Sequence, residues 1–432
     1  MNKTTAKSLR PPGSRAWVEI SRKALKHNYD TIRKHIAASA TGFGEPKGIS
    51  TKLMAVVKSN AYGHGIIEYA KTMAGFGADW LGVDTAVEGL LVRRELKKIP
   101  ILALGYTLPE KLPEAATKDI SVSVSNIEHL KTLQQLGDQV AKLRVHIKVD
   151  SGMHRQGFLL EEIPSTLKFF KQHLLQVVIE GVYTHFAAAK NPVMRDSVEK
   201  QLAEFQKALA IINLDPGLRR DDTKGTGVIR HACNSGATLI YPEAHLDMVR
   251  VGIALYGLWP EEATKRAVQK RCQTPFAHSA PPAGRAGLRV YGQKGSDPFS
   301  LQPALAWKTV VGEVKRLPNG GQIGYDLTES VPPGTVIAVC PVGYWHGLFR
   351  AHSSVMDVLV RGKRAKILGR VSMDMIVINV TGIKGVQMGD EVTIVGTDGK
   401  ETVSAEEVAA LAGTSNYELV TRINPYTKRV YC

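Results

Sequence analysis

The feature that most constrains the fold is an alternation, between residues 50 and 257, of short β-branched apolar runs with segments of helical period. This pattern is typical of parallel strands joined by crossover helices. Helix starts are predicted at Thr85 and Ser125, because each is followed three residues later by a glutamate. Eight strand–helix units predict an α/β fold, a (β/α)8 TIM-type barrel whose function gathers at the carboxyl ends of its strands. The predicted strands are 53–57, 80–83, 99–104, 120–124, 143–149, 176–184, 227–231 and 246–250.

The pattern changes after residue 257. Residues 263–300 contain four prolines and four glycines without a sustained period, and we expect a basic insert or linker there. Residues 301–432 hold strands separated by turn clusters rather than long helices, which predicts a mainly antiparallel β domain with one helix after Ser404. The barrel domain is assigned to 17–262, although its first strand, Ala16–Ile20, is expected to join the β domain. The predicted strands of the second domain are 307–317, 335–342, 355–360, 365–380 and 391–395.

Lysine and arginine outnumber aspartate and glutamate by 56 to 40, so a nucleic-acid partner has to be considered. The excess is concentrated outside the expected domains. The tail, residues 1–16, has four cations and no anion, and residues 263–300 have seven cations and one anion. A nucleic-acid face would instead interleave cations with aromatics on regular elements. We therefore expect no nucleic-acid partner.

Cysteine spacing and hydropathy favour a soluble, cytoplasmic protein. The four cysteines are far apart and lack zinc-like spacing with histidine, so neither a disulfide framework nor a metal site is expected. No apolar run approaches the length of a membrane helix, and the basic start lacks the apolar core of a secretory signal.

The segment that carries the chemistry begins where the first barrel strand ends at Lys58, which places an amine at the barrel mouth as a Schiff-base partner. Residues 56–65 read V-V-K-S-N-A-Y-G-H-G. This run strongly resembles the lysine motif of bacterial alanine racemases, which are fold-type III enzymes dependent on pyridoxal 5'-phosphate (PLP). The resemblance covers about 16–262 and 301–431, and it implies PLP bound to Lys58.

Two later segments match the phosphate-binding motifs of that family. Strand seven is followed by H-A-C-N-S-G at 231–236, and strand eight by R-V-G-I-A-L-Y-G at 250–257. Loops after strands seven and eight are the usual phosphate site of such barrels. The cofactor-binding residues implied here are Tyr62, Asn234, Ser235, Gly252 and Ile253.

An arginine occupies the family position that faces the pyridine nitrogen of PLP. The resemblance assigns this role to Arg250 and assigns to His185 the role of orienting it. An arginine cannot stabilise a protonated nitrogen, so the carbanion should be only modestly delocalised, which restrains side reactions.

The segment K-V-D-S-G-M-H-R-Q-G at 148–157 also matches the family pattern. It implies that Arg155 contacts the phenolic oxygen of the cofactor and helps to bind substrate. It further implies that Lys148 can be carbamylated; the alternative is that Lys148 is a charge partner for Asp150.

The β domain supplies the remaining parts implied by the resemblance. Racemisation needs bases on opposite faces of the substrate, and Tyr325, in G-G-Q-I-G-Y-D, matches the tyrosine that the partner subunit delivers opposite Lys58. Tyr344 and Arg350 would line the entrance, and Met373 would bind the substrate carboxylate through its backbone. The entrance segment departs from the family pattern at residues 345 and 346, where Trp-His replaces Ala-Asp.

The expected function is PLP-dependent interconversion of L- and D-alanine by a homodimer, with Lys58 and Tyr325 as the two bases, to supply D-alanine for peptidoglycan. A broad-specificity amino-acid racemase and a non-catalytic PLP-binding protein are the alternatives left open. A decarboxylase of the same fold is disfavoured because it would place an acid against the pyridine nitrogen.

Overall fold

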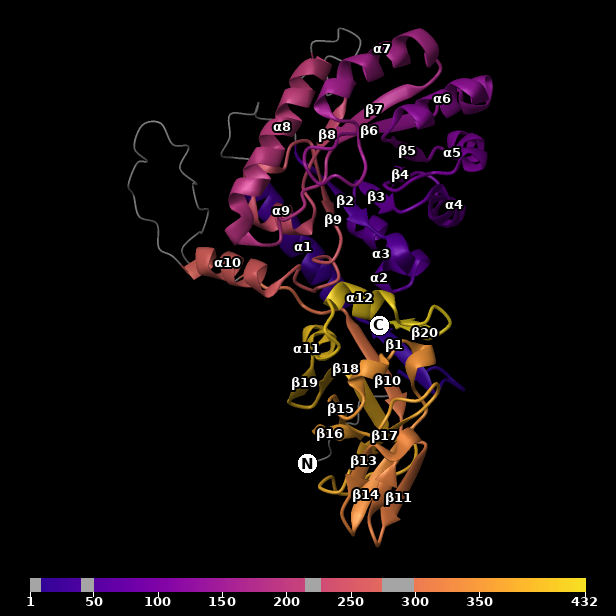
Figure 1. The fold of residues 1–432 in the computed structure, drawn as a ribbon, viewed down its shortest axis with the longest axis vertical. Helices are drawn as coiled ribbons and strands as arrows, with labels where there is room; N and C mark the ends of the chain where they lie inside the picture. The colour runs from indigo at the N-terminus through magenta and orange to yellow at the C-terminus, as the bar shows by residue number, and fades with distance from the viewer. Residues whose placement is uncertain (1–8, 40–49, 214–226, 274–298) are drawn as a thin grey trace. The chain divides into compact units, whose positions relative to one another are not determined.

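The computed structural model describes residues 9–39, 50–213, 227–273 and 299–432, which fall into two compact units (Figure 1). The barrel unit comprises Lys26–Lys58 and Tyr69–Leu301, and the β unit comprises the residues up to Leu25 together with Ser59–Glu68 and Gln302–Cys432. The ten residues from 59 to 68 therefore leave the barrel unit and belong to the β unit.

Within the described residues, the barrel unit holds an eight-stranded parallel sheet in the order β8-β7-β6-β5-β4-β3-β2-β9. Its two ends are joined by backbone hydrogen bonds from Asp247 N to Arg230 O and from Arg250 N to Cys233 O, so the barrel is nearly closed. Buried apolar side chains such as Met54, Trp80 and Leu102 pack together in its interior. The predicted barrel is confirmed. Its strands are β2 Lys52–Val56, β3 Trp80–Val83, β4 Ile101–Ala103, β5 Ser121–Val124, β6 Arg144–Lys148, β7 Val178–Tyr183, β8 Ile229–His231 and β9 Met248–Val251.

Helices follow the barrel strands along the chain. The Thr85 hydroxyl accepts from Glu88 N at the start of α4, as predicted. The start of α6 is one residue later than predicted, because Asn126 Oδ1 accepts from His129 N at 2.8 Å and an asparagine caps as well as a serine. None of the helices in the described ranges combines the length and apolar character needed to cross a membrane. The helices are α1 Arg22–Ser39, α3 Ile66–Phe76, α4 Ala86–Glu95, α5 Leu112–Thr117, α6 Ile127–Leu136, α7 Ile163–His173, α8 Arg195–Asn213 and α9 Ser235–Ile240.

The β unit is built on a mostly antiparallel sheet in the order β11-β14-β17-β16-β15-β18-β10-β1-β20, with β19 paired to β18. Strand β1, Ala16–Ile20, lies in this sheet between β10 and β20. The predicted helix after Ser404 is present as α11, Ala405–Leu411, and α12, Asn416–Thr421, follows it. The other strands are β10 Leu305–Val310, β11 Glu313–Leu317, β12 Gly321–Ile323, β13 Glu329–Val331, β14 Thr335–Cys340, β15 Asp357–Val360, β16 Lys363–Leu368, β17 Ile376–Asn379, β18 Glu391–Asp398, β19 Glu401–Val403 and β20 Lys428–Tyr431.

Two strands predicted as continuous are each divided in two. The predicted strand 307–317 breaks at residues 311 and 312, so that β10 pairs with β18 while β11 pairs with β14. The predicted strand 365–380 breaks after Leu368, where Gly369 adopts a φ of 68° that a strand does not allow. The loop that follows, 369–375, contains one of the implied substrate-binding residues.

The first part of the expected insert is helical. Helix α10 spans Glu262–Gln273, a stretch without proline or glycine. Thr264 and Val268 are buried on one face of it, and Arg266 pairs with Glu262 at 3.4 Å. The absence of regular structure expected from residue 263 onward was therefore wrong for this part. Residues 274–298 of the insert and 1–8 of the tail lie outside the described residues.

Candidate active site

The candidate nucleophile Lys58 lies two residues after the end of β2, at the carboxyl edge of the barrel. Its Nζ is 3.3 Å from Oδ1 of Asp84, which follows the neighbouring strand β3. The Lys58 side chain is 38% exposed, so the amine is held by one carboxylate yet accessible from solvent. Sequence reasoning missed Asp84, although its position directly after a strand was the available signal.

The segment after Lys58 has an unusual backbone. Four consecutive residues that are not glycine, from Ser59 to Tyr62, have φ between 49° and 56°, which makes a left-handed turn. Such a conformation costs roughly 1–2 kcal/mol per residue for L-amino acids. Asn60 holds the turn, because its backbone oxygen accepts from Gly65 N and its Oδ1 accepts from Ile66 N, both at 3.0 Å. Strain of this kind is typical of functional sites.

The end of the chain clamps the same segment within the β unit. The Gly63 backbone lies so close to α12 that a Cβ on it would be 1.9 Å from Val420 O. Arg429 Nε donates to Gly63 O and the Tyr431 hydroxyl donates to His64 O, each at 3.0 Å. Gly63 and His64, which follow Tyr62, are therefore fixed by residues more than three hundred positions away in sequence.

The two predicted phosphate loops meet within the barrel unit. The Ser235 hydroxyl accepts from Gly252 N at 2.9 Å, which joins the loop after β8 to the loop after β9. Asn234 caps α9 by accepting from Ala237 N. Ile253 is buried, and within the described residues its backbone N–H meets no acceptor. A buried N–H without an acceptor is rare, so this donor suits an anionic ligand.

Arg250 is buried in the barrel with 3% of its surface exposed. Its Nη2 donates to the carbonyl oxygens of Thr184 and Ala232, and its Nη1 donates to His231 O at 3.1 Å and Nδ1 at 2.9 Å. Burial lowers the pKa of Arg250 to about 10, which leaves the guanidinium charged at neutral pH. Its hydrogen-bond partners within the described residues are carbonyls and imidazoles, so the charge meets no carboxylate there.

Two histidines contact this arginine. The predicted one, His185, is at 3.5 Å from Nη2, whereas His231 is at 2.9 Å from Nη1. Sequence reasoning used His231 only as part of the phosphate motif and missed this contact. Burial and the charge of Arg250 hold the pKa of both histidines well below the usual range, so both rings are neutral. Tyr183 packs beside them, with its ring stacked on that of His231 at 4.8 Å.

Lys148 ends β6 and is 5% exposed. Its Nζ donates to Gln156 Oε1 at 2.8 Å, while the carboxylate of Asp150 accepts the backbone N–H groups of residues 152–154. Burial, reinforced by the charges of Arg155, Arg250 and Lys58, lowers the pKa of Lys148 to about 8. Four cationic side chains therefore gather at this edge of the barrel.

This donor set fits the cofactor implied by the sequence motif. PLP carries a phosphate and a phenolic oxygen, both of which need positive or N–H partners. The barrel unit offers a buried guanidinium without a carboxylate partner among the described residues, a buried N–H on Ile253, and an accessible amine on Lys58. An anionic cofactor would offset the mutual repulsion that lowers the pKa of Lys148.

The predicted tyrosine base lies on the surface of the β unit. Tyr325 begins a short 3-10 turn and is 70% exposed. The next residue, Asp326, has a φ of 57° and pairs with Arg370 at 2.7 Å and with Arg350 at 3.9 Å. These ion pairs fix the backbone next to Tyr325 and tie it to the loop at 369–375.

The implied entrance and substrate loops are bonded to each other. Tyr344 N donates to Ser372 O and Trp345 N donates to Met373 O, both at 3.0 Å. Gly343 makes this approach possible, since a Cβ there would be 2.2 Å from Ser372 O. Tyr344, Trp345 and Met373 are each about half exposed. The structure thus brings together the β-unit residues that the sequence placed in separate motifs.

Comparison with protein families places this geometry in context. The model of the alanine racemase N-terminal domain matches residues 20–260, and that of the alanine racemase C-terminal domain matches residues 304–431. An alanine racemase of Leptospira interrogans is 34% identical over 420 residues, covering 96% of this chain and 95% of that protein. An alanine racemase of Symbiobacterium thermophilum is 35% identical over 416 residues, covering 96% of each.

Solved structures agree with the sequence comparison. The alanine racemase of Bacillus anthracis, crystallised with bound L-Ala-P, superposes with a TM-score of 0.81 and 31% identity over 98% of this chain and 96% of that one. The alanine racemase of E. faecalis gives a TM-score of 0.78 at 31% identity, covering 98% and 100%.

Proposed function

The chain belongs to the alanine racemase family of isomerases, and from this premise we propose that it interconverts L- and D-alanine with PLP, using Lys58 and Tyr325 as opposing bases. The observation that carries the proposal is the buried Arg250, which has no carboxylate partner among the described residues, beside the accessible amine of Lys58 at the edge of the barrel. That combination suits a cofactor with a ring nitrogen and an aldehyde.

Different residues would bind different parts of PLP. Lys58 would bind its aldehyde carbon, and Arg250 would donate to its ring nitrogen. Ser235, Gly252, Ile253 and Tyr62 would hold its phosphate. When bound, PLP withdraws electrons from the α-carbon of alanine and so acidifies the α-proton.

Proton transfer would be shared between two side chains on opposite faces. Lys58 Nζ would remove the α-proton of D-alanine and return one when D-alanine forms. The deprotonated phenolic oxygen of Tyr325 of the partner subunit would remove the α-proton of L-alanine, and the hydroxyl so formed would return a proton when L-alanine forms. The exposure of Tyr325 and the ion pairs that fix Asp326 support delivery of this ring to a second copy of the chain, so we include a homodimer in the proposal.

Substrate would be oriented by the cation cluster and the substrate loop. Arg155 and the backbone N–H of Met373 are the carboxylate-binding groups in this proposal, with Tyr344 and Arg350 at the entrance. Lys148 would be carbamylated: its Nζ attacks the carbon of CO2 and releases a proton, and the new anion would neutralise the neighbouring cations. The lowered pKa of Lys148 supports this, because a neutral amine is required.

The D-alanine formed would supply peptidoglycan synthesis in the cytoplasm, a location that the free, buried Cys233 and Cys340 support. Rescue of a D-alanine auxotroph by this chain tests that role. The activity itself is tested by a chiral assay over a panel of amino acids with added PLP. Conversion of alanine alone supports the proposal, conversion of many amino acids favours a broad-specificity racemase, and PLP binding without conversion favours a non-catalytic protein.

Replacing Lys58 by alanine should abolish racemisation and the absorbance of lysine-bound PLP. Racemisation by the Lys58→Ala protein at the wild-type rate would overturn the assignment of Lys58. Lys52 at the other end of β2, replaced in the same way, provides a lysine-to-alanine control on the same strand.

A further inference from the structure

The contact between Arg250 and His231 continues into the barrel as a chain of hydrogen bonds. His231 Nε2 is 2.8 Å from His146 Nδ1, and His146 Nε2 is 3.3 Å from Glu180 Oε2. Both histidines have no exposed surface. We call Glu180, His146 and His231 the histidine relay; it connects a carboxylate to the cofactor-facing arginine through two neutral rings.

The positions of the hydrogen atoms in the histidine relay follow from the groups at its two ends, the Glu180 carboxylate and the Arg250 guanidinium. Burial holds the pKa of His146 and of His231 below the usual range, so each ring carries one proton. A carboxylate only accepts, so His146 must donate through Nε2 and accept at Nδ1. His231 must then donate through Nε2, which leaves its Nδ1 as the acceptor for Arg250 Nη1. One arrangement satisfies every contact.

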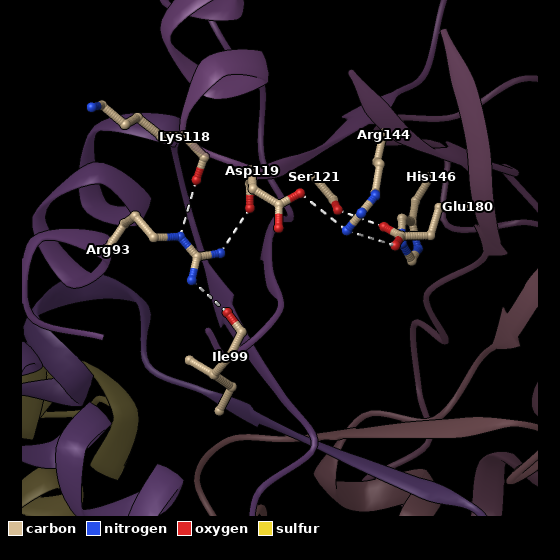
Figure 2. Close-up of polar contacts among 8 residues, drawn as sticks. All are labelled: Arg93, Ile99, Lys118, Asp119, Ser121, Arg144, His146 and Glu180. Atoms are coloured by element: carbon tan, nitrogen blue, oxygen red, sulfur yellow. Dashed lines mark hydrogen bonds and ion pairs between the residues drawn. The ribbon is translucent and has the colours of Figure 1, made fainter. Parts of the chain in front are cut away.

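Polar side chains contact the carboxylate of Glu180, as Figure 2 shows. Ser121 Oγ donates to Glu180 Oε2 at 2.5 Å, and Arg144 Nη1 is 3.7 Å from Oε1. These partners, with His146, lower the pKa of Glu180 despite its burial, so it is an anion at neutral pH. Arg144 also pairs with Asp119 at 3.0 Å.

The backbone makes room for the relay. A Cβ on Gly181 would be 2.2 Å from His146 Nδ1, so only glycine at this position leaves space for the ring. The register between β6 and β7 shifts between Val145 and His146, at the same place. Trp80 packs edge-on against His146 at 5.5 Å.

We propose that Glu180 is a positioning residue for racemisation, which sets the tautomers of His146 and His231 and thereby keeps an acceptor against Nη1 of Arg250. The catalytic consequence rests on the proposed function, whereas the tautomers do not. Without the carboxylate, the Nδ1 of His231 can carry the proton and would then oppose the N–H of Arg250.

Glu180→Gln gives a directional test. The amide oxygen would turn toward the cation of Arg144, and the amide nitrogen would then donate to Nε2 of His146. The whole relay would reverse, which places protons on Nδ1 of both histidines. Nitrogen-15 NMR of histidine-labelled, cofactor-free protein reads these positions directly, independently of any activity.

The wild-type protein should show Nε2–H on His146 and His231, and the Glu180→Gln protein should show Nδ1–H. A protonated Nδ1 in the wild type, or wild-type tautomers in a folded Glu180→Gln protein, would overturn the inference. The wild-type measurement stands even where the variant fails to fold. Asp119→Asn is the matched control: it removes a carboxylate beside Arg144 outside the relay, at a φ of 54° that asparagine tolerates, and should keep the wild-type signals.

In the PLP-loaded enzyme, Glu180→Gln should lower kcat about tenfold, which corresponds to about 1.4 kcal/mol, with little change in KM. Alanine contacts no relay residue in this proposal, so its binding should be spared. Unchanged kcat with reversed tautomers would overturn the catalytic role of Glu180. Racemisation by the Lys58→Ala protein would instead contradict the proposed function. The tautomers measured by NMR would still hold in that case.

Discussion

Arg250 Nη1 and His231 Nδ1 lie 2.9 Å apart in the barrel interior, and this pair joins the candidate cofactor site to the buried histidine relay. The same guanidinium donates to backbone oxygens of Thr184, Ala232 and His231. Its orientation is therefore determined by backbone oxygens at the end of β8 and directly after β7. The imidazole of His231 is a fourth acceptor, and a planar guanidinium can donate to all four together.

Arg250→Lys should keep the positive charge at this position but lose the planar arrangement of hydrogen-bond donors. A single ammonium cannot serve carbonyls on both sides, so buried acceptors lose donors at a cost of about 2 kcal/mol in the free energy of unfolding. Urea unfolding of the cofactor-free protein measures this. Racemisation should fall by about one to two orders of magnitude.

Arg230→Lys is the matched control for that change. Arg230 lies on β8 and pairs with Asp247 through two contacts, at 2.8 Å and 3.0 Å, of which a lysine can keep one. Its racemisation rate should remain close to wild type. Equal losses in both variants would show that Arg250 matters only for folding.

The barrel could be predicted from sequence because each strand is a local apolar run, and the prediction matched all eight. The left-handed turn at 59–62 could not, since no glycine marks it and distant residues such as Arg429 hold it. The relay was also missed, because His146, Glu180 and His231 lie on three strands and acquire meaning only when these strands are adjacent. The splits near Gly312 and Gly369 were missed because apolar periodicity continues across a change of partner strand.

The stability of the cofactor-free protein should increase with pH above about 8 through Lys148. Folding lowers the pKa of this amine from 10.5 to about 8, so between these values the unfolded chain binds more protons than the folded one. The free energy of unfolding then rises with pH, by at most about 1.4 kcal/mol per unit for one proton, and the penalty is fully present below pH 8.

Lys148→Met removes that dependence. Urea unfolding measures the free energy of unfolding at pH 7 and at pH 9.5. Between these two pH values this free energy should rise less, or fall more, in the variant than in the wild type. Identical pH dependence in the two proteins would contradict the assigned pKa of Lys148.

A mixed dimer should recover activity that neither parent has. Lys58→Ala and Tyr325→Phe each remove one of the proposed bases, so both of the proposed homodimers should be inactive. If Tyr325 acts in the partner's site, an exchanged heterodimer contains one intact site and one doubly defective site. Mixing at equal amounts should restore roughly a quarter of wild-type activity. No recovery after verified subunit exchange would mean that both bases come from one chain.

Gly181→Ala should destabilise the protein through His146. The new methyl group would overlap the ring, with a cost of about 1–3 kcal/mol for overpacking. In a His146→Ala background the ring is absent and the added methyl group has room. The loss of unfolding free energy should then nearly vanish. Double-mutant analysis of unfolding free energies measures this coupling; additive effects would place the clash elsewhere.

Gly63→Ala should disrupt the segment that follows Lys58. Its φ of 80° is unfavourable for alanine, and the added Cβ would meet the Val420 carbonyl at 1.9 Å, a contact that only backbone movement can relieve. The clamp by Arg429 and Tyr431 would then loosen, and Tyr62 would lose its fixed place. We expect weaker PLP binding and a large loss of racemisation.

Gly75→Ala is the control, because a Cβ there meets nothing within 4 Å in helix α3, and alanine should stabilise that helix by about 0.5–1 kcal/mol. A PLP titration followed by absorbance separates the two variants, and equal PLP affinity would contradict a positioning role for the clamp.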